Sequence, residues 1–128
     1  MRNATKLLGV GAIGVALLAM PATAFAGDRD VERAGSCSGR SDWKLKLSPE
    51  DGGLEVEFEV DQNVVSDTWR VVIRQNGDVL KRGRRTTEGP SGSFEIRAVG
   101  NNTAGIDRFK ARAINVSTEE TCVGRASI

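Results

Sequence analysis

Two runs of alternating residues between Ser41 and Val60 restrict the fold more than any other part of the chain. In both runs apolar side chains occupy every second position, and segment 48–53 between them contains one proline and two glycines. A period of two places all the apolar side chains on one face of an extended strand. The pattern predicts an antiparallel pair whose apolar face consists of Trp43, Leu45, Leu47, Leu54, Val56, Phe58 and Val60.

The turn between the two runs determines which residues face each other. We place Leu47 opposite Leu54, so that lysines and glutamates also meet on the polar face. The pairs predicted from this register are Leu47–Leu54, Leu45–Val56 and Trp43–Phe58 on the apolar side, and Lys46–Glu55 and Lys44–Glu57 on the polar side.

The first 26 residues have the pattern of a cleavable signal peptide. Arg2 and Lys6 form a positive start, residues 7–20 are apolar and uncharged, and Ala24-Phe25-Ala26 supplies the small residues of a cleavage site. Fourteen apolar residues are fewer than the ~20 needed to span a bilayer. We therefore expect cleavage before Gly27, secretion, and no membrane association of the mature chain.

The charge balance argues against a nucleic-acid partner. The signal segment holds two of the 18 basic residues and no acidic one, which leaves 16 basic residues against 17 acidic ones. A mature chain with a net charge of −1 has no overall basic field. No nucleic-acid partner is expected.

The two cysteines, Cys37 and Cys122, lie near the two ends of the mature chain. In a protein bound for an oxidising compartment this arrangement predicts a disulfide. The chain has no histidine and no second cysteine pair, so no metal site and no cofactor are expected.

Residues 27–36 are polar and charged without apolar periodicity, and we expect them to form a flexible lead-in to a domain spanning 37–128. Five further extended segments follow the opening pair, with Asn76-Gly77 as a hairpin signal between the first two. These segments are 68–75, 79–87, 93–98, 106–114 and 121–128. Seven strands without a convincing helix predict an all-β, two-sheet antiparallel β-sandwich, whose first and last strands the disulfide joins.

Segment 79–87 contains the densest cluster of positive charge, formed by Lys81, Arg82, Arg84 and Arg85. The segment lacks a clean apolar face, and either a bulge near Gly83 or a position at the edge of a sheet accounts for that. We favour the edge. The cluster then has two interpretations: protection of an exposed edge, or docking of an anionic partner such as a cell-wall polymer, a lipid head group or an acidic protein.

Two segments of the chain resemble known proteins. Segment 105–115 resembles the penultimate strand of immunoglobulin-like domains, with Asp107 before an aromatic Phe109 and Ala111 at the place of the conserved cysteine. The resemblance implies an immunoglobulin-like or fibronectin type III-like sandwich. Residues 37–128 also resemble small secreted proteins of actinobacteria, a group that implies export and a bridged domain but no activity. The motifs shared with this group are Cys37-Ser38-Gly39, Trp43-Lys44-Leu45-Lys46, 55–61, 89–94 and Glu120-Thr121-Cys122.

The residue inventory argues against catalysis. Without histidine, neither a Ser-His nor a Cys-His pair can form. Glu55, Glu57 and Glu59 share one face, but facing lysines favour ionised, solvated carboxylates over a catalytic acid. Trp43 and Trp69 lie on apolar faces and are expected to pack in the core rather than line a sugar site.

Three functional hypotheses follow. The first is a secreted, non-enzymatic interaction module that holds a protein or a cell-wall polymer through its sheet edges or loops. The second is a module that binds cell-wall carbohydrate. The third, a small secreted hydrolase, has the least support.

Overall fold

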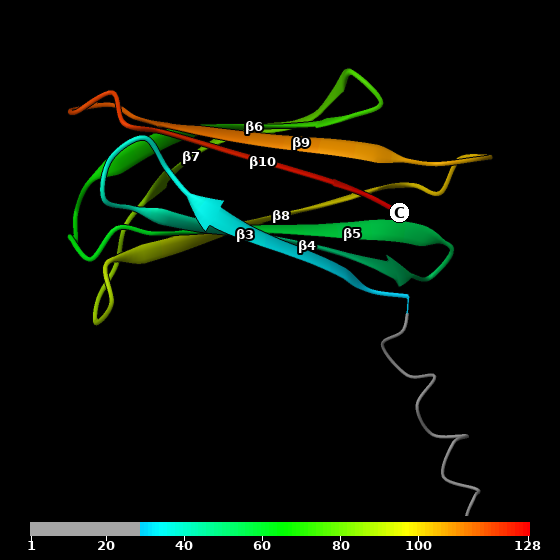
Figure 1. Cartoon of the computed structure of the whole chain (residues 1–128), viewed down its shortest axis with the longest axis horizontal. Coiled ribbons are helices and arrows are strands. Elements are labelled where there is room, and N and C mark those ends of the chain that lie inside the picture. The colour runs from blue at the N-terminus through cyan, green and yellow to red at the C-terminus, as the bar shows by residue number, and fades with distance from the viewer. Residues whose placement is uncertain (1–28) are drawn as a thin grey trace, which may run out of the picture.

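Two four-stranded antiparallel sheets face each other across an apolar core in residues 29–128, the part of the chain that the computed structural model describes (Figure 1). One sheet has the strand order β3-β4-β5-β8 and the other has the order β10-β9-β6-β7. The strands are β3 Val31–Ser36, β4 Asp42–Glu50, β5 Gly53–Asp61, β6 Thr68–Gln75, β7 Asp78–Thr86, β8 Ser93–Asn101, β9 Arg108–Asn115 and β10 Thr121–Ser127. The all-β sandwich prediction is confirmed, while the signal peptide predicted for 1–26 lies outside the described residues.

The chain passes between the sheets three times. Strands β3, β4 and β5 form consecutive hairpins, after which loop 62–67 carries the chain to the other sheet. Strand β8 then returns to pair with β5, and β9 crosses back to pair with β6. These connections make neighbours of segments far apart in sequence, so the composition of each sheet face depends on topology as well as on local pattern.

Strand β3 was not expected, and the prediction of a flexible lead-in over 27–36 is wrong for residues 31–36. This segment pairs along its whole length with β4. It shows little alternation because it is an edge strand in which only Val31 packs against the core. Backbone hydrogen bonds to β4 and the covalent link at Cys37 hold it instead. The sandwich therefore has eight strands rather than seven.

The core consists of side chains from the inward faces of both sheets, as the alternation predicts. From β4 and β5 it takes the predicted apolar face, except that Trp43 is only partly buried. The opposite sheet contributes large side chains from β6 and β9. The fully buried members with the largest side chains are Trp69, Phe58, Leu45, Leu47, Leu54, Ile73 and Ile96.

The β4–β5 register differs by two residues from the expected one. The turn contains only Asp51 and Gly52, both with positive φ (49° and 83°), so Glu50 pairs with Gly53. Two-residue turns of this kind match the twist of the flanking strands. A shift of two leaves every side chain on its predicted face, but the pairs become Leu47–Val56, Leu45–Phe58, Trp43–Val60, Lys46–Glu57 and Lys44–Glu59.

The two tryptophans occupy different environments. Trp69 is fully buried, and its indole nitrogen donates a hydrogen bond to Gln62 (3.0 Å), as expected for a core residue. Trp43 is only partly buried and lies between Gly35 of β3 and Gly124 of β10. A Cβ added at either glycine would approach the indole ring to 2.8 Å, so only glycine lets these two strands close over Trp43.

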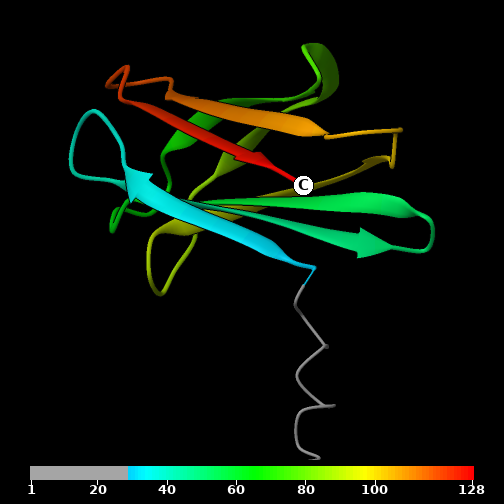
Figure 2. The same ribbon diagram turned by 45° about the vertical axis from the view of Figure 1, so that its right-hand side comes forward.

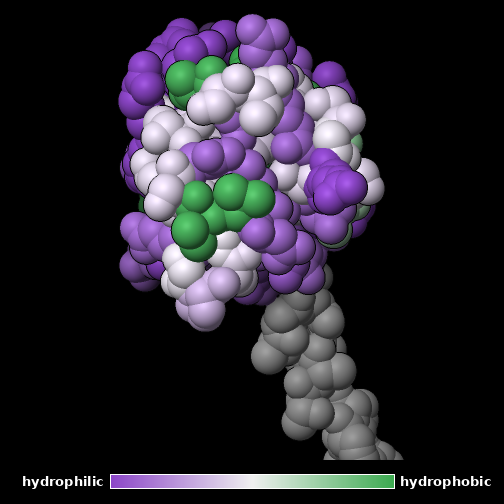
Figure 3. Space-filling view, turned by 90° about the vertical axis from the view of Figure 1, so that its left-hand side faces the viewer, coloured by the Kyte–Doolittle hydropathy of each residue, from purple (hydrophilic) through white to green (hydrophobic). Residues whose placement is uncertain are grey.

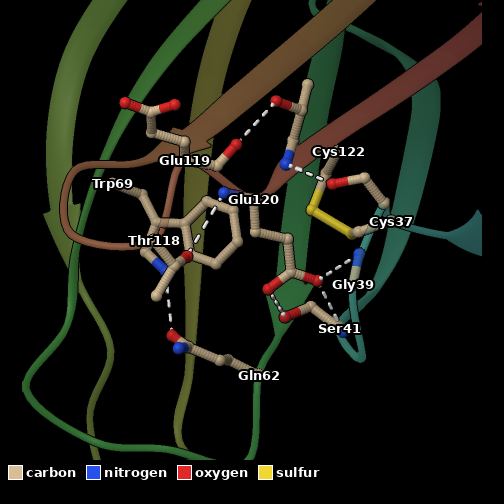
Figure 4. The surroundings of a disulfide bond; sticks show 11 residues. Cys37, Gly39, Ser41, Gln62, Trp69, Thr118, Glu119, Glu120 and Cys122 are labelled. Carbon is tan, nitrogen blue, oxygen red and sulfur yellow. Dashed lines mark hydrogen bonds between the residues drawn. A yellow bond between two sulfur atoms is a disulfide. The ribbon is translucent and has the colours of Figure 1, made fainter.

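The predicted disulfide between Cys37 and Cys122 is present and spans 85 residues of sequence. It joins the end of β3 to β10, which belong to different sheets but lie next to each other in both ribbon views (Figures 1 and 2). The Glu120 carboxylate fixes the adjacent loop by accepting hydrogen bonds from the backbone N–H groups of Gly39 and Ser41 and from the Ser41 hydroxyl (Figure 4). The disulfide thus closes the sandwich along one side.

Two aspartates organise loops at opposite ends of the sandwich. Asp107 is fully buried, and burial alone would raise its pKa, but hydrogen bonds from Thr103, Gln75 and Asn76 outweigh burial and leave the pKa below the usual value. Hydrogen bonds from the Gln62 and Asn115 side chains likewise lower the pKa of Asp67.

These two carboxylates should make the fold less stable in acid. Because their pKa values are lower in the folded chain, the unfolded chain binds more protons as the pH falls. Their contribution is complete above the ordinary value of 3.8 and is lost as the pH falls through the lower folded values. In urea titrations between neutral pH and about pH 2, the stability gap between wild type and Asp107→Asn should narrow.

Asp78→Asn, at the exposed start of β7, is the matched control and should cost little at neutral pH. An Asp107→Asn variant as stable as wild type at neutral pH would contradict the role of the Asp107 network.

Candidate anion-binding face

The outward surface of the β10-β9-β6-β7 sheet carries only positive formal charge. Inward and outward side chains alternate on these strands, and the inward set contains Trp69, Val71, Phe109 and Ala111. The outward set therefore includes eight cations, which we call the basic face. Its charged members are Arg70 and Arg74 on β6, Arg82 and Arg84 on β7, Arg108, Lys110 and Arg112 on β9, and Arg125 on β10.

The register brings these cations directly opposite one another. Arg70 faces Arg84 across β6 and β7, and Lys110 of β9 lies between Arg74 on one side and Arg125 on the other. Like charges in facing positions destabilise a sheet. No ion pair within residues 29–128 involves a member of the basic face. The fold therefore carries an electrostatic cost here that no acidic neighbour relieves.

The opposite outer surface, on β3-β4-β5-β8, is arranged differently. Facing positions there combine lysine with glutamate, and Arg97 forms ion pairs with Glu55 and Glu57. Its like-charge pairs are Glu59 with Glu95 and, at one end of β4 and β5, Asp42 with Asp61. The pKa of Glu95 is raised because partial burial and the nearby Glu57 carboxylate disfavour its charged form. Charge compensation is thus a feature of one sheet and is missing from the other.

The cluster predicted on 79–87 divides between two surfaces. Arg82 and Arg84 belong to the basic face, whereas Lys81 and Arg85 pair with inward-facing Ile73 and Trp69, are half-buried and lie on the other face of β7. Strand β7 is an edge strand, as predicted. The register shift falls between Ile73 and Arg74, which leaves Leu80 as the extra residue instead of a bulge at Gly83.

Sequence reasoning did not select the other six members of the basic face. Five of these six stand at polar positions of an alternating strand, which is unremarkable within that strand: Arg70, Arg74, Arg108, Lys110 and Arg112. The sixth is Arg125 on the last strand. The signal that could have found them is the repeat of cations at polar positions of three separate segments. Its meaning depends on the pairing of β6 with both β7 and β9.

Two neighbouring hollows lie in the middle of the basic face. One, of about 310 Å³, is lined by Val72 and by four cations, Arg74, Arg82, Lys110 and Arg112. The other, of about 320 Å³, lies on the β6–β7 side and shares Val72 and Arg82 with it. Both hollows form because Val72 is short and is surrounded by long side chains from adjacent strands.

Two other surfaces have features of a binding site. Loops gather at the end of the sandwich seen in Figure 3, where small apolar patches interrupt a hydrophilic surface; in loop 62–67, Val64 and Val65 are each 50% exposed. A hollow of about 510 Å³ near β3 and β4 is lined in part by Trp43, Asp42, Glu59 and Asp61. The hollow near β3 and β4 thus places a tryptophan beside three acidic side chains.

The glutamates considered as catalytic acids, Glu55, Glu57 and Glu59, lie on β5 and face residues of β4 and β8. Glu55 is only 7% exposed and is ion-paired with Arg97, not with Lys46 as expected.

In residues 29–128 no group of three or more His, Cys, Asp or Glu side chains is placed to hold a metal ion. The same residues include no helix with the length and apolar character needed to cross a membrane.

Comparison with known proteins identifies no similar protein. No protein-family model matches the chain, and no match was found among curated proteins or among solved structures. The class of protein is therefore defined by the fold and the site alone: a disulfide-bridged antiparallel β-sandwich with one uncompensated basic sheet face.

Proposed function

We propose that this chain is an exported, non-enzymatic binding module whose basic face holds an anionic polymer at the cell surface. The observation that carries the proposal is the set of eight outward cations on four neighbouring strands with no acidic residue among them. A flat surface of one sign attracts a polymer that can lie across several strands at once. Arginine, seven of the eight, is well suited to oxyanion recognition.

Edge protection does not account for this surface. Charged residues on an edge strand discourage pairing with other chains, and this explains Lys81 and Arg85. However, β6 and β9 are central strands with neighbours on both sides, so their cations protect no edge. Cations retained in facing positions at a cost to stability are the kind of local conflict found at functional sites.

Export and fold type are part of the same proposal. A disulfide across two sheets of a small domain is consistent with an oxidising, extracellular environment and with the signal-peptide pattern of residues 1–26. The strand order, with β4-β5-β8 facing β10-β9-β6-β7, supports a sandwich of the immunoglobulin-like or fibronectin type III-like kind. We also place the chain with the small secreted actinobacterial proteins that its motifs resemble.

Nucleic acid is a less suitable partner than a cell-surface polymer. Near-zero net charge no longer argues against it, because charge is segregated between the two outer faces. However, proteins that bind single strands stack bases on aromatic side chains. Trp69 and Phe109, the aromatic residues of β6 and β9, point into the core and leave the basic face without a stacking platform.

Adjacent residues on β7 provide a matched test. Arg82→Gln/Arg84→Gln removes two charges from the basic face, whereas Lys81→Gln/Arg85→Gln removes two charges from the other side of the same strand. At about 1 kcal/mol per cation near an anionic surface, the first pair should weaken binding to an anionic wall polymer about 30-fold. The second pair should change it less than threefold. Titration of the full chain at low and moderate salt measures both effects.

Equal losses in the two double variants would show that net charge, and not the face, governs binding. Wild-type affinity that is independent of salt would also contradict the proposal, because contacts to an oxyanion polymer release counterions and weaken as salt rises.

A second candidate function is carbohydrate binding in the hollow beside Trp43. A partly buried indole next to Asp42, Glu59 and Asp61 supplies an apolar surface and polar acceptors, which a sugar ring requires. Because Trp69 is fully buried, any fluorescence change on addition of a neutral wall glycan should arise from Trp43. A response that survives Trp43→Phe would count against this site.

A further inference from the structure

We propose that the 310 Å³ hollow in the middle of the basic face is a pocket for a tetrahedral oxyanion, a phosphate or sulfate group carried by the polymer. This inference rests on the proposed function and specifies the chemical group that the face selects. The pocket is lined by Val72, Arg74, Arg82, Lys110 and Arg112.

The four cations line the pocket from three strands, and the Arg74 guanidinium also donates a hydrogen bond to the Gly77 carbonyl (3.1 Å). Val72 pairs with Arg82 on one side and with Arg112 on the other, while Arg74 pairs with Lys110 in the next row of the same face. Facing Cα atoms in antiparallel strands are about 4.5 to 5.5 Å apart, and successive residues on one face are about 6.8 Å apart. Long side chains rooted at these distances can direct their charged ends to one point above Val72.

The arrangement suits a tetrahedral group better than a planar one. A carboxylate presents two oxygens in one plane and is satisfied by a single guanidinium in a bidentate pair. A phosphate or sulfate presents oxygens in several directions, so donors that approach from three strands can each reach a different oxygen. Among residues 29–128 no ion pair ties up any of the four cations, and no acidic side chain lines the pocket.

The pocket also has the size and position of a binding site. Its volume is at the lower end of the range of about 300 to 1,000 Å³ that ligand pockets occupy. Its lining comes from β6 and from both neighbours of β6 in the sheet, β7 and β9. A polymer bound across the face would therefore pass over it.

Polymers of equal charge but different anionic groups test the inference. The probes are polyphosphate, dextran sulfate and poly-L-glutamate, titrated calorimetrically into the full chain. Because hydrogen bonds to charged groups each contribute about 1.5 to 3 kcal/mol, at least one tetrahedral polymer should bind about tenfold more tightly than polyglutamate. Comparison of polyphosphate with dextran sulfate identifies which tetrahedral group is preferred.

Two double variants with the same charge loss locate the preference. Arg82→Gln/Arg112→Gln should bring the affinity ratio of tetrahedral polymer to polyglutamate close to one. Arg84→Gln/Arg125→Gln removes two cations that do not line the pocket, so it should weaken all three polymers and leave the ratio near ten.

The outcomes separate this inference from the proposed function. Equal wild-type affinity for all three polymers would overturn the pocket and leave the basic face intact. Failure of every polymer to bind would overturn both. If the control variant Arg84→Gln/Arg125→Gln also loses the affinity ratio of tetrahedral polymer to polyglutamate, the pocket assignment is wrong. Tighter binding per charge to oligothymidylate than to polyphosphate would assign the basic face to nucleic acid instead.

Discussion

Replacing both Cys37 and Cys122 by alanine is expected to lower the free energy of unfolding by about 4 to 5 kcal/mol. The disulfide closes a loop of 85 residues, and closing so long a loop removes many conformations from the unfolded chain. The loss is large compared with the total stability of a small domain, about 5 to 15 kcal/mol. Guanidinium unfolding of the full chain, followed by tryptophan fluorescence, measures it, since Trp69 is fully buried in the folded state.

Local disorder should accompany the loss of stability. Strand β3 has little apolar surface of its own and is held by pairing with β4 and by the link at Cys37. Amide exchange in β3 should therefore accelerate more than exchange in β5 or β6. A wild-type protein treated with reductant should reproduce both effects, and a decrease below about 1 kcal/mol would show that the sheets close without the cross-link.

Neutralising the central strands of the basic face is expected to reduce polymer binding about a hundredfold. The variant is Arg70→Gln/Arg74→Gln/Arg112→Gln, which removes three cations from β6 and β9. Each cation near an anionic surface is worth about 1 kcal/mol, so three give a factor of this order. The free energy of unfolding should stay the same or rise by several tenths of a kcal/mol, because facing like charges are removed.

The other outer face offers a control with the same change in charge. Lys44→Gln/Lys46→Gln/Arg97→Gln removes three cations that face or pair with glutamates. This variant should keep most of its affinity for the polymer but lose stability, because it leaves Glu55 and its neighbours without partners. If binding falls equally in both triple variants, long-range net charge explains the attraction and the basic face does not.

Local sequence pattern was sufficient for seven of the eight strands and for the inward faces of β4, β5, β6, β8 and β9. Alternation identified the core residues from Leu45 to Ala113, because burial of one face leaves a signal with a period of two. It could not determine the β4–β5 register, since the choice between a six-residue turn and the two-residue turn at Asp51-Gly52 depends on backbone conformation. The pattern did not predict strand β3, because backbone pairing and a disulfide hold this strand instead of apolar contacts.

The candidate site depended on information that local pattern does not contain. Arg82 and Arg84 were found through their density in one segment, but Lys81 and Arg85, which belong to the same run, face the other way. The cations of β9 join them only because β6 lies between β7 and β9. The net charge of the chain gave no sign of the basic face, because basic and acidic residues on opposite sheets cancel in the total.

Mapping the contact surface by NMR tests the central claim most directly. An isotopically labelled chain titrated with polyphosphate should show backbone and arginine side-chain shifts concentrated on β6, β7 and β9, largest around Val72, with β4 and β5 unchanged. Shifts concentrated in loop 62–67, around Trp43, or on the β3-β4-β5-β8 sheet would contradict the assignment of binding to the basic face.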